Sequence, residues 1–239
     1  MILNLQSVTA IARKNASGSW TAEATLLSNL EFYIEMDSDG TSSTGSNNAT
    51  VSGATNTTGF FGNGYSTDGV NDYLSSGYAP TLTSGGGYDF AVGFYFKTSA
   101  NTKIMTGCRN VSNNNSGMWV YVDGSGNVQV RTRTNTPQET NTNSTGTAWN
   151  DGAWHRLIYT IKQGEQRLWI DGTNVASASA TITGDIDLTL PYYLGGRNEG
   201  GAPVLPILCV FDEWFMKSEF MSAEQIALDW DGGNGLPYN

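Results

Sequence analysis

The chain contains a single histidine, His155, within the stretch DGAWHRLIYTIKQGEQRLWIDGTNV at residues 151–175. A histidine that acts as a general base needs a nucleophile or carboxylate partner and access to a substrate. In a strand over this stretch, His155 shares its face with the apolar residues Leu157, Tyr159 and Ile161. We therefore expect His155 to pack against the core and to hydrogen-bond to backbone groups, without a role in catalysis.

A second set of residues has the chemistry of carbohydrate binding. The stretch GMWVYVDGSGNVQVRTR predicts a hairpin with strands at residues 118–122 and 127–133. If its aliphatic residues face the core, the opposite face carries Trp119, Tyr121, Gln129, Arg131 and Arg133. Aromatic rings cover the C–H faces of sugars, and amide and guanidinium groups bind hydroxyls or acidic substituents. The alternatives are a packing layer under residues 134–152 or a subunit interface, where Trp, Tyr and Arg are also enriched.

These residues depend on short strands separated by turns. In YDFAVGFYFKT, the side chains of Phe90, Val92, Phe94 and Phe96 share one face, as in a half-buried strand. The stretch around His155 predicts a second hairpin that turns at Gln163–Gly164. Residues 134–152 are predicted to form a long polar loop. Further strands are predicted at residues 29–36, 67–74, 183–195 and 207–216.

One helix is predicted, at the C-terminal stretch MSAEQIALDWDGG. Ser222 is a good N-cap, and Gln225 completes a capping box. The apolar face of this helix is predicted to hold Ile226, Ala227 and Trp230. Together these elements predict an all-β fold in which two antiparallel sheets pack face to face, with the short C-terminal helix over one edge. Residues 1–28 are weakly patterned and are expected to be an arm or accessory segment before a domain at residues 29–239.

The composition excludes several classes of partner. Charged residues make up only 14% of the chain, and the formal net charge is −10. A pI near 4.4 argues against a nucleic-acid binder, which needs a basic surface, and against docking on anionic membranes. No apolar stretch approaches the roughly 18 residues of a membrane span. The start of the chain lacks the pattern of a signal peptide, so we expect synthesis in a cytoplasm without export. Cys108 and Cys209 are expected to be buried, reduced thiols.

Four segments, in order, resemble the laminin-G-like (pentraxin-type) domains of the concanavalin A-like lectin/glucanase superfamily. They are GYSTDGVNDYLSS, YDFAVGFYFKTS, the histidine hairpin, and YYLGGRNEGG followed by LCVFDEWFMKSEFMSAEQIALDWDGG. The resemblance covers roughly residues 30–233 and implies a jelly-roll sandwich. It does not imply an activity, because one fold carries many functions.

The resemblance also implies a possible calcium site. Pentraxin-like relatives hold calcium with an Asn/Asp pair that follows the Asp-Gly turn within the first motif and with acidic residues in the loop after the glycine pair. The matching positions are Asn71 and Asp72, then Asn198 and Glu199, whose oxygens suit calcium. Arg197 stands where a ligand carboxylate is expected, and the alternative is that Asp72 caps a turn and pairs with Arg197.

Glucanases of the same superfamily carry three carboxylates on a mid-chain strand, and the nearest stretch here is IEMDSDG. It contains Glu35, Asp37 and Asp39, but it lies in the first predicted strand and ends in a turn. Asp212 and Glu213 are adjacent and are expected to point to opposite sheet faces. By alternation, Asp212 is expected to be an inward, hydrogen-bonded structural acid. We therefore expect no catalytic residues.

A lectin-like sandwich made without an export signal is similar to components of bacteriophage particles, which leave the host by lysis. We therefore expect a non-enzymatic virion surface protein: a capsid decoration, head fibre or tail appendage. Its expected partners are other virion subunits, further copies of itself, and host or environmental glycans. One alternative is a glycan-active hydrolase or a carbohydrate-binding module of a larger enzyme. Another is a structural capsid cement protein whose aromatic face binds other subunits.

Overall fold

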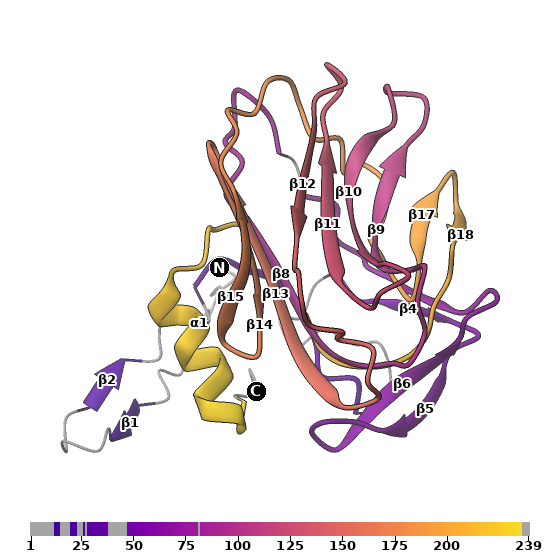
Figure 1. The fold of residues 1–239 in the computed structure, drawn as a ribbon, viewed down its shortest axis with the longest axis vertical. Helices are drawn as coiled ribbons and strands as arrows, with labels where there is room; N and C mark the ends of the chain where they lie inside the picture. Colours follow the sequence, from indigo (N-terminus) through magenta and orange to yellow (C-terminus); the bar gives the residue numbers. More distant parts are fainter. Residues whose placement is uncertain are drawn as a thin grey trace, which may run out of the picture.

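The structure is a computed structural model that describes residues 12–14, 20–22, 26, 28–37, 47–80 and 82–235. Two sheets pack face to face in two layers (Figure 1). Strand pairing is antiparallel apart from one parallel contact between Asn198 and Cys108. The two-sheet antiparallel jelly-roll sandwich with a short C-terminal helix is thus confirmed.

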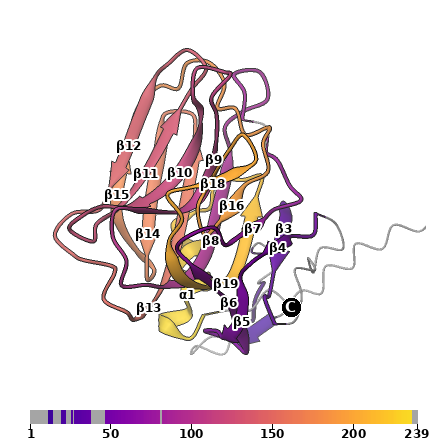
Figure 2. The same cartoon turned by 90° about the vertical axis from the view of Figure 1, so that its right-hand side faces the viewer.

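The first layer is a nine-stranded sheet with the order β12-β11-β10-β9-β16-β7-β4, to which β17 and β18 are added beside β9. Figure 2 looks toward this sheet, with β12 on the left and β7 and β4 on the right. Its strands are β4 (Thr50–Ser52), β7 (Tyr73–Ser75), β9 (Lys103–Asn110), β10 (Ser116–Val122), β11 (Val128–Arg133), β12 (Glu139–Asn143), β16 (Tyr193–Leu194), β17 (Arg197–Glu199) and β18 (Ala202–Val204).

The second layer is an eight-stranded sheet with the order β15-β14-β13-β8-β19-β6-β5, and β3 pairs with β19. A separate pair, β1 (Ala12–Lys14) and β2 (Trp20–Ala22), lies in the segment predicted to be an arm. The strands of the second layer are β3 (Leu30–Ile34), β5 (Thr55–Thr58), β6 (Asn63–Asp68), β8 (Phe90–Lys97), β13 (Trp154–Lys162), β14 (Glu165–Ile170), β15 (Thr173–Ala178) and β19 (Leu208–Lys217).

The main core lies between the two sheets. Alternating residues of β8, β10, β11 and β13 fill it, including the aliphatic side of the hairpin formed by β10 and β11. The predicted inward residues Leu157, Tyr159 and Ile161 belong to this core, as do Cys108 and Cys209. Both cysteines are buried free thiols, as predicted, and burial raises the pKa of each.

Strand β8 is buried on both faces, so the expectation of a half-buried strand is wrong. Its outward residue Ala91 belongs to a second apolar cluster, and Gly93 lies against the ring of Phe215. This cluster sits between the outer face of the eight-stranded sheet and α1 (Ala223–Trp230). The helix therefore covers a face of the sheet rather than an edge (Figure 1). Ser222 and Gln225 form the predicted capping box, but Ala227 is exposed and Asp229 is buried in its place.

Three predicted segments differ from the structure. Residues 67–74 do not form one strand, because Asp68 accepts the N–H groups of Val70 and Asn71 and turns the chain between β6 and β7. Residues 183–195 form a strand only at Tyr193–Leu194. The predicted loop at 134–152 contains β12, which pairs with β11 and extends the nine-stranded sheet.

Candidate functional site

The outer side of the nine-stranded sheet carries the sequence-predicted binding residues on one face. Trp119 lies directly opposite Arg131, and Tyr121 lies opposite Gln129, across the β10–β11 pair. Arg133 lies opposite Gly117, whose other neighbour is Arg109 of β9. Because directly opposite residues share a face, these side chains form one surface. We call it the arginine face and define it as Arg109, Trp119, Tyr121, Gln129, Arg131, Arg133 and Arg197.

Trp119 is the centre of the arginine face, but its ring is not an open platform. Only 6% of the residue is exposed. The guanidinium of Arg197 lies 4.7 Å from the centre of its ring, a cation–π distance. Gly107 on the neighbouring strand makes room for Trp119, since a β-carbon there would stand 2.5 Å from that of Trp119. A sugar therefore cannot stack on Trp119 as it stands, and Tyr121, which is half-buried, is the accessible aromatic ring.

Arg109 and Arg197 share one carboxylate. The Arg197 side chain donates to Glu199 at 2.6 Å, and Arg109 donates to the other oxygen of the same carboxylate. Burial acts to raise the pKa of Glu199, but these two hydrogen bonds outweigh it and hold the pKa below its ordinary value. Burial lowers the pKa of Arg197, and the nearby charges of Arg109 and Arg131 lower it further. The face thus holds three guanidinium groups close together, and two of them, those of Arg109 and Arg197, share the Glu199 carboxylate.

Arg131 differs from its neighbours because its contacts are weak. Its side chain reaches the Gln129 amide oxygen at 3.5 Å and lies 5.8 Å from the centre of the Tyr121 ring. By contrast, Arg133 donates to the Asn114 carbonyl at 3.0 Å and to Glu139 at 3.4 Å. Within the part of the chain that the structure describes, no carboxylate pairs with Arg131. Arg131 is therefore the guanidinium most able to bind a ligand.

Three of the buried side-chain donors that have no acceptor among the described residues belong to the arginine face. The Nε–H groups of Arg109, Arg131 and Arg197 are all buried and have no hydrogen-bond partner among the described residues. A buried donor left unpaired costs about 1–3 kcal/mol. Because protein atoms cover these Nε–H groups, a ligand would reach Arg131 through its terminal nitrogens, which are not among the buried donors without acceptors.

The residues Asn71 and Asp72, predicted to bind calcium, take part in a turn. The N–H of Asn71 donates to the Asp68 carboxylate at 3.2 Å. The Asp72 carboxylate accepts the N–H of Asp68 at 3.1 Å, which fits the alternative that it caps a turn. These contacts explain both residues through local structure.

Asn198 and Glu199, the other predicted calcium ligands, are also engaged. The Asn198 amide donates to the Pro191 carbonyl at 2.9 Å and accepts the Gly201 N–H at 2.9 Å. Arg197 pairs with Glu199, so its predicted pairing with Asp72 is wrong. Across the described residues, no group of three or more His, Cys, Asp or Glu side chains is placed to hold a metal. Calcium binding stays a prediction of the sequence.

The carboxylates Asp212 and Glu213 lie on the outer face of the eight-stranded sheet. A β-bulge with a positive φ of 51° at Glu213 breaks the alternation of β19. Asp212 lies opposite the outward residue Tyr95, and Glu213 accepts the hydroxyl of the outward residue Tyr33. The predictions that Asp212 points inward and that the pair points to opposite faces are therefore wrong.

Asp212 is nevertheless a buried, hydrogen-bonded structural acid, as expected. Its carboxylate accepts the N–H groups of Phe60 and Phe61 at 2.9 and 2.8 Å and that of Glu213 at 2.9 Å. Burial raises the pKa of Asp212 to about 7 against these bonds, and burial raises the pKa of Glu213 to about 8.

His155 packs against the core, as predicted, but its hydrogen-bond partners differ. Its ring lies against Phe96 and Trp149. Its two nitrogens contact the carboxylates of Asp171 at 2.7 Å and Asp151 at 3.1 Å, whereas backbone partners were expected. Burial acts to lower the pKa of His155, but the two carboxylates outweigh it and raise the pKa. Both ring nitrogens are therefore committed to structural bonds.

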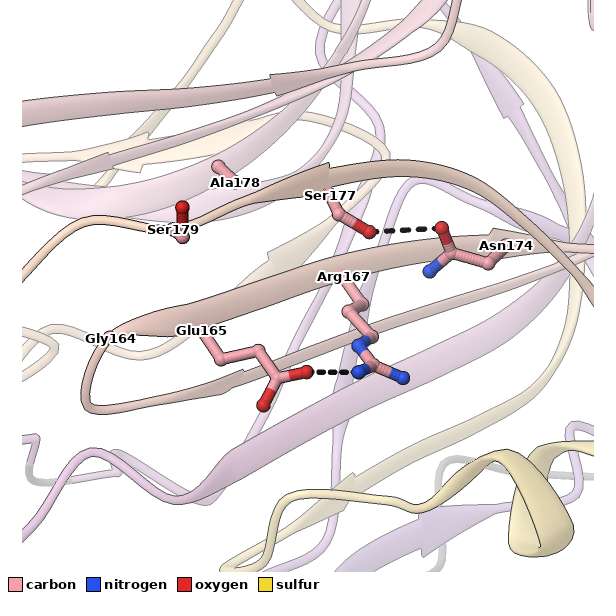
Figure 3. A pocket seen from close by; sticks show the side chains of 7 residues that line it. All are labelled: Gly164, Glu165, Arg167, Asn174, Ser177, Ala178 and Ser179. Atoms are coloured by element: carbon pink, nitrogen blue, oxygen red, sulfur yellow. Dashed lines mark hydrogen bonds and ion pairs between the residues drawn. The ribbon is translucent and has the colours of Figure 1, made fainter.

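A shallow hollow of about 390 Å³ lies on β14 and β15 (Figure 3). Its polar groups bind one another: Glu165 pairs with Arg167, and the Ser177 hydroxyl donates to Asn174 at 3.0 Å. Glu165 also pairs with Lys162 at 2.9 Å. Because these groups already satisfy each other, the hollow offers a ligand less than the arginine face does.

Sequence reasoning missed two members of the arginine face. Arg109 is on β9 and Arg197 is on β17, and both approach Trp119 only through pairing between distant segments. A stacked pair, Tyr73 and Tyr193, with ring centres 4.2 Å apart, extends the aromatic surface onto β7 and β16. Alternation along β9 could have placed Arg109 on the outer face, because Arg109 follows Cys108, which faces the core.

Comparison with known proteins places the fold. Residues 68–227 match the laminin G family model described as the concanavalin A-like lectin/glucanases superfamily. No curated protein sequence matches the chain.

Several solved structures share the fold at low sequence identity. Domain 4 of an extracellular arabinanase from Geobacillus stearothermophilus, in complex with arabinotriose, is 16% identical, with a TM-score of 0.62 over 87% of this chain and 98% of that one. The ligand-binding domain of botulinum neurotoxin serotype D, in complex with N-acetylneuraminic acid, is 14% identical, with a TM-score of 0.66 over 88% and 52%. Trypanosoma rangeli sialidase in complex with sialic acid is 13% identical, with a TM-score of 0.69 over 95% and 37%.

The chain thus spans about half of the neurotoxin domain and a smaller share of the sialidase. At these identities the likeness shows the fold alone, and it agrees with the two packed sheets described above. The family match covers more than half of the chain. The chain therefore belongs to the concanavalin A-like lectin/glucanases superfamily, as a laminin-G-like domain.

Proposed function

We propose that this chain is a glycan-binding domain and that it binds through the arginine face. The observation that carries the proposal is the half-buried guanidinium of Arg131, which pairs with no carboxylate among the described residues and lies beside the half-buried ring of Tyr121. Sugars supply many acceptor oxygens together with apolar C–H faces, so they complement such a surface. Two structures with this fold are complexes with arabinotriose and N-acetylneuraminic acid, which supports a carbohydrate ligand here.

The proposal includes binding without catalysis. Retaining hydrolysis needs two carboxyl groups about 5–5.5 Å apart on supported elements. Strand β3 ends at Ile34, before Glu35 and Asp37, and Asp39 lies outside the described residues. Asp37 is exposed and accepts the Asn63 N–H at 2.7 Å. These features favour binding over hydrolysis.

The proposed setting is the surface of a virus particle, with other virion subunits and further copies of the chain as partners. The composition rich in Gly, Asn, Thr and Ser supports a surface exposed to proteases. No helix in the described residues is long and apolar enough to cross a membrane. Capsid or tail genes beside this gene, and the chain itself in purified particles by mass spectrometry, are the expected observations. Neighbouring genes for polysaccharide breakdown would instead favour a module of an enzyme.

A glycan array tests the binding proposal. The wild-type chain is expected to bind a defined set of glycans, and a Tyr121→Ala/Arg131→Ala variant is expected to lose that binding. Arg167→Ala is the matched control, because Arg167 is a partly exposed arginine on the other sheet. If no glycan binds and Trp119 and Tyr121 are found between subunits, the structural cement alternative replaces this proposal. Release of reducing sugar from β-glucans, lost in Glu35→Gln, would overturn the absence of catalysis.

A further inference from the structure

We infer that the arginine face selects sugars that carry a carboxylate, such as uronic or sialic acid residues, and that Arg131 binds this carboxylate. This inference rests on the proposed function and adds a ligand class and a specificity-determining residue to it.

The charge of the arginine face is opposite to that of the chain. The chain carries a formal net charge of −10, yet Arg131 and Arg197 both adjoin Trp119, and Arg109 lies beside them through Glu199. Glu199 neutralises only one of these three cations, and Arg133 is balanced by Glu139. The positive surface attracts anionic ligands, and the acidic remainder of the protein repels them.

Glu199 shows how a carboxylate fits this surface. Its two oxygens accept N–H groups from two guanidiniums, those of Arg197 and Arg109. Arg131 is also a guanidinium, but it is half-buried, and the acceptor it reaches among the described residues is the Gln129 amide oxygen at 3.5 Å. The planar fork of a guanidinium matches the two oxygens of a carboxylate with parallel hydrogen bonds. A ligand carboxylate at Arg131 would supply the acceptor that the protein does not.

The surroundings of Arg131 suit the rest of a sugar ring. Asn141 lies opposite Arg131 on β12, and Asn143 lies opposite Gln129. Both asparagines are exposed, so their amides are accessible to hydroxyl groups. Tyr121, next to Arg131 on the other side, presents an aromatic ring to the C–H face of the sugar.

Calorimetry with matched ligands tests the inference. The ligands are oligogalacturonate and its methyl ester, together with sialyllactose, lactose and sulfated lactose, all at low ionic strength. We expect the wild-type chain to bind at least one carboxylated sugar about tenfold more tightly than its uncharged counterpart, since a hydrogen bond to a charged group contributes about that factor. Arg131→Gln is expected to remove this preference, so that the variant binds the acidic sugar no more tightly than its uncharged counterpart. Arg167→Gln, on the other sheet, is expected to keep the preference, and matching melting temperatures show that the variants are folded.

The outcomes separate the inference from the proposed function. Equal affinity for the acid and the ester, or an unchanged preference in Arg131→Gln, overturns the inference while glycan binding stands. Sulfated lactose that binds as tightly as sialyllactose overturns the assignment to carboxylates. Absence of binding to any neutral or acidic glycan overturns the proposed function and the inference with it.

Discussion

The buried ion pair between Arg156 and Asp229 fixes helix α1 to the sandwich, and its removal gives a strong test of the structure. The guanidinium of Arg156 donates to both oxygens of Asp229, at 2.9 and 2.8 Å, and the two side chains are 1% and 0% exposed. It also donates to the Glu213 carbonyl at 3.0 Å and lies against the rings of Tyr95 and Phe215. Asp229→Asn keeps the shape but leaves this buried guanidinium without its neutralising carboxylate.

The expected cost follows from the burial. Removing one partner of a buried pair costs about 3–5 kcal/mol, because the remaining charge stays desolvated. Asparagine also turns one acceptor oxygen into an NH₂ donor that faces the donors of Arg156. In a chain of this size, each 1 kcal/mol shifts the melting temperature by about 2–4 °C, so Asp229→Asn is expected to lower it by about 6–20 °C.

Urea denaturation followed by tryptophan fluorescence measures this cost as a change in the free energy of unfolding. The double variant Arg156→Met/Asp229→Leu serves as the control, because it removes both charges and keeps apolar volume. It is expected to be more stable than Asp229→Asn alone, since a well-packed apolar pair avoids the desolvated charge. A free energy of unfolding for Asp229→Asn within about 1 kcal/mol of the wild type would refute the reasoning.

The remaining predictions concern pH, backbone space and helix capping. Burial raises the pKa of Asp212 to about 7 and that of Glu213 to about 8, so the folded state holds protons that the unfolded carboxyls release. Stability should therefore fall as pH rises from about 4 to about 8, and the melting temperature of Glu213→Gln should fall less; parallel pH profiles would contradict this. At Gly107, φ is 145° and an added β-carbon would stand 2.5 Å from β10, so Gly107→Ala should cost on the order of 2 kcal/mol in urea denaturation. Gly85→Ala, with open space around it, is the control, and an equal cost in both would contradict the reasoning. Ser222→Ala removes the N-cap of α1 and should lower the free energy of unfolding by about 1 kcal/mol; an unchanged value would show that the cap does not stabilise the helix.

The fold was predictable because its signals are local. Period-two alternation in β8, β10, β11 and β13 assigned the inward residues correctly, since a strand with one face in the core has only one workable register. The capping box at Ser222 marked the start of the helix because it depends only on residues close together in the sequence. Alternation gave the wrong face for Asp212, because the β-bulge at Glu213 changes which residues of β19 face the core. No residue type signals a bulge unambiguously.

The candidate site was only partly predictable because it is assembled from distant segments. Trp119, Tyr121, Gln129 and Arg131 belong to one hairpin, so their shared face follows from alternation. Arg197 reaches the same face through the pairing of β17 with β9, and sequence alone did not indicate this pairing. The same long-range contact covers Trp119, which is why this aromatic residue, suited to sugar stacking, is buried.

The outer faces of the two sheets differ in what covers them, and we call the face of the eight-stranded sheet the back and that of the nine-stranded sheet the front. On the back, α1 covers part of the eight-stranded sheet (Figure 1). The apolar cluster and the buried Arg156–Asp229 pair join the helix to the sheet. The front carries the arginine face. Under the proposed function, each copy contributes one glycan contact through the arginine face, so strong attachment to a glycan-coated surface would need many copies that present this face in the same direction. In such an array, modest single-site affinities multiply into high avidity when the spacing of the copies matches that of the glycans.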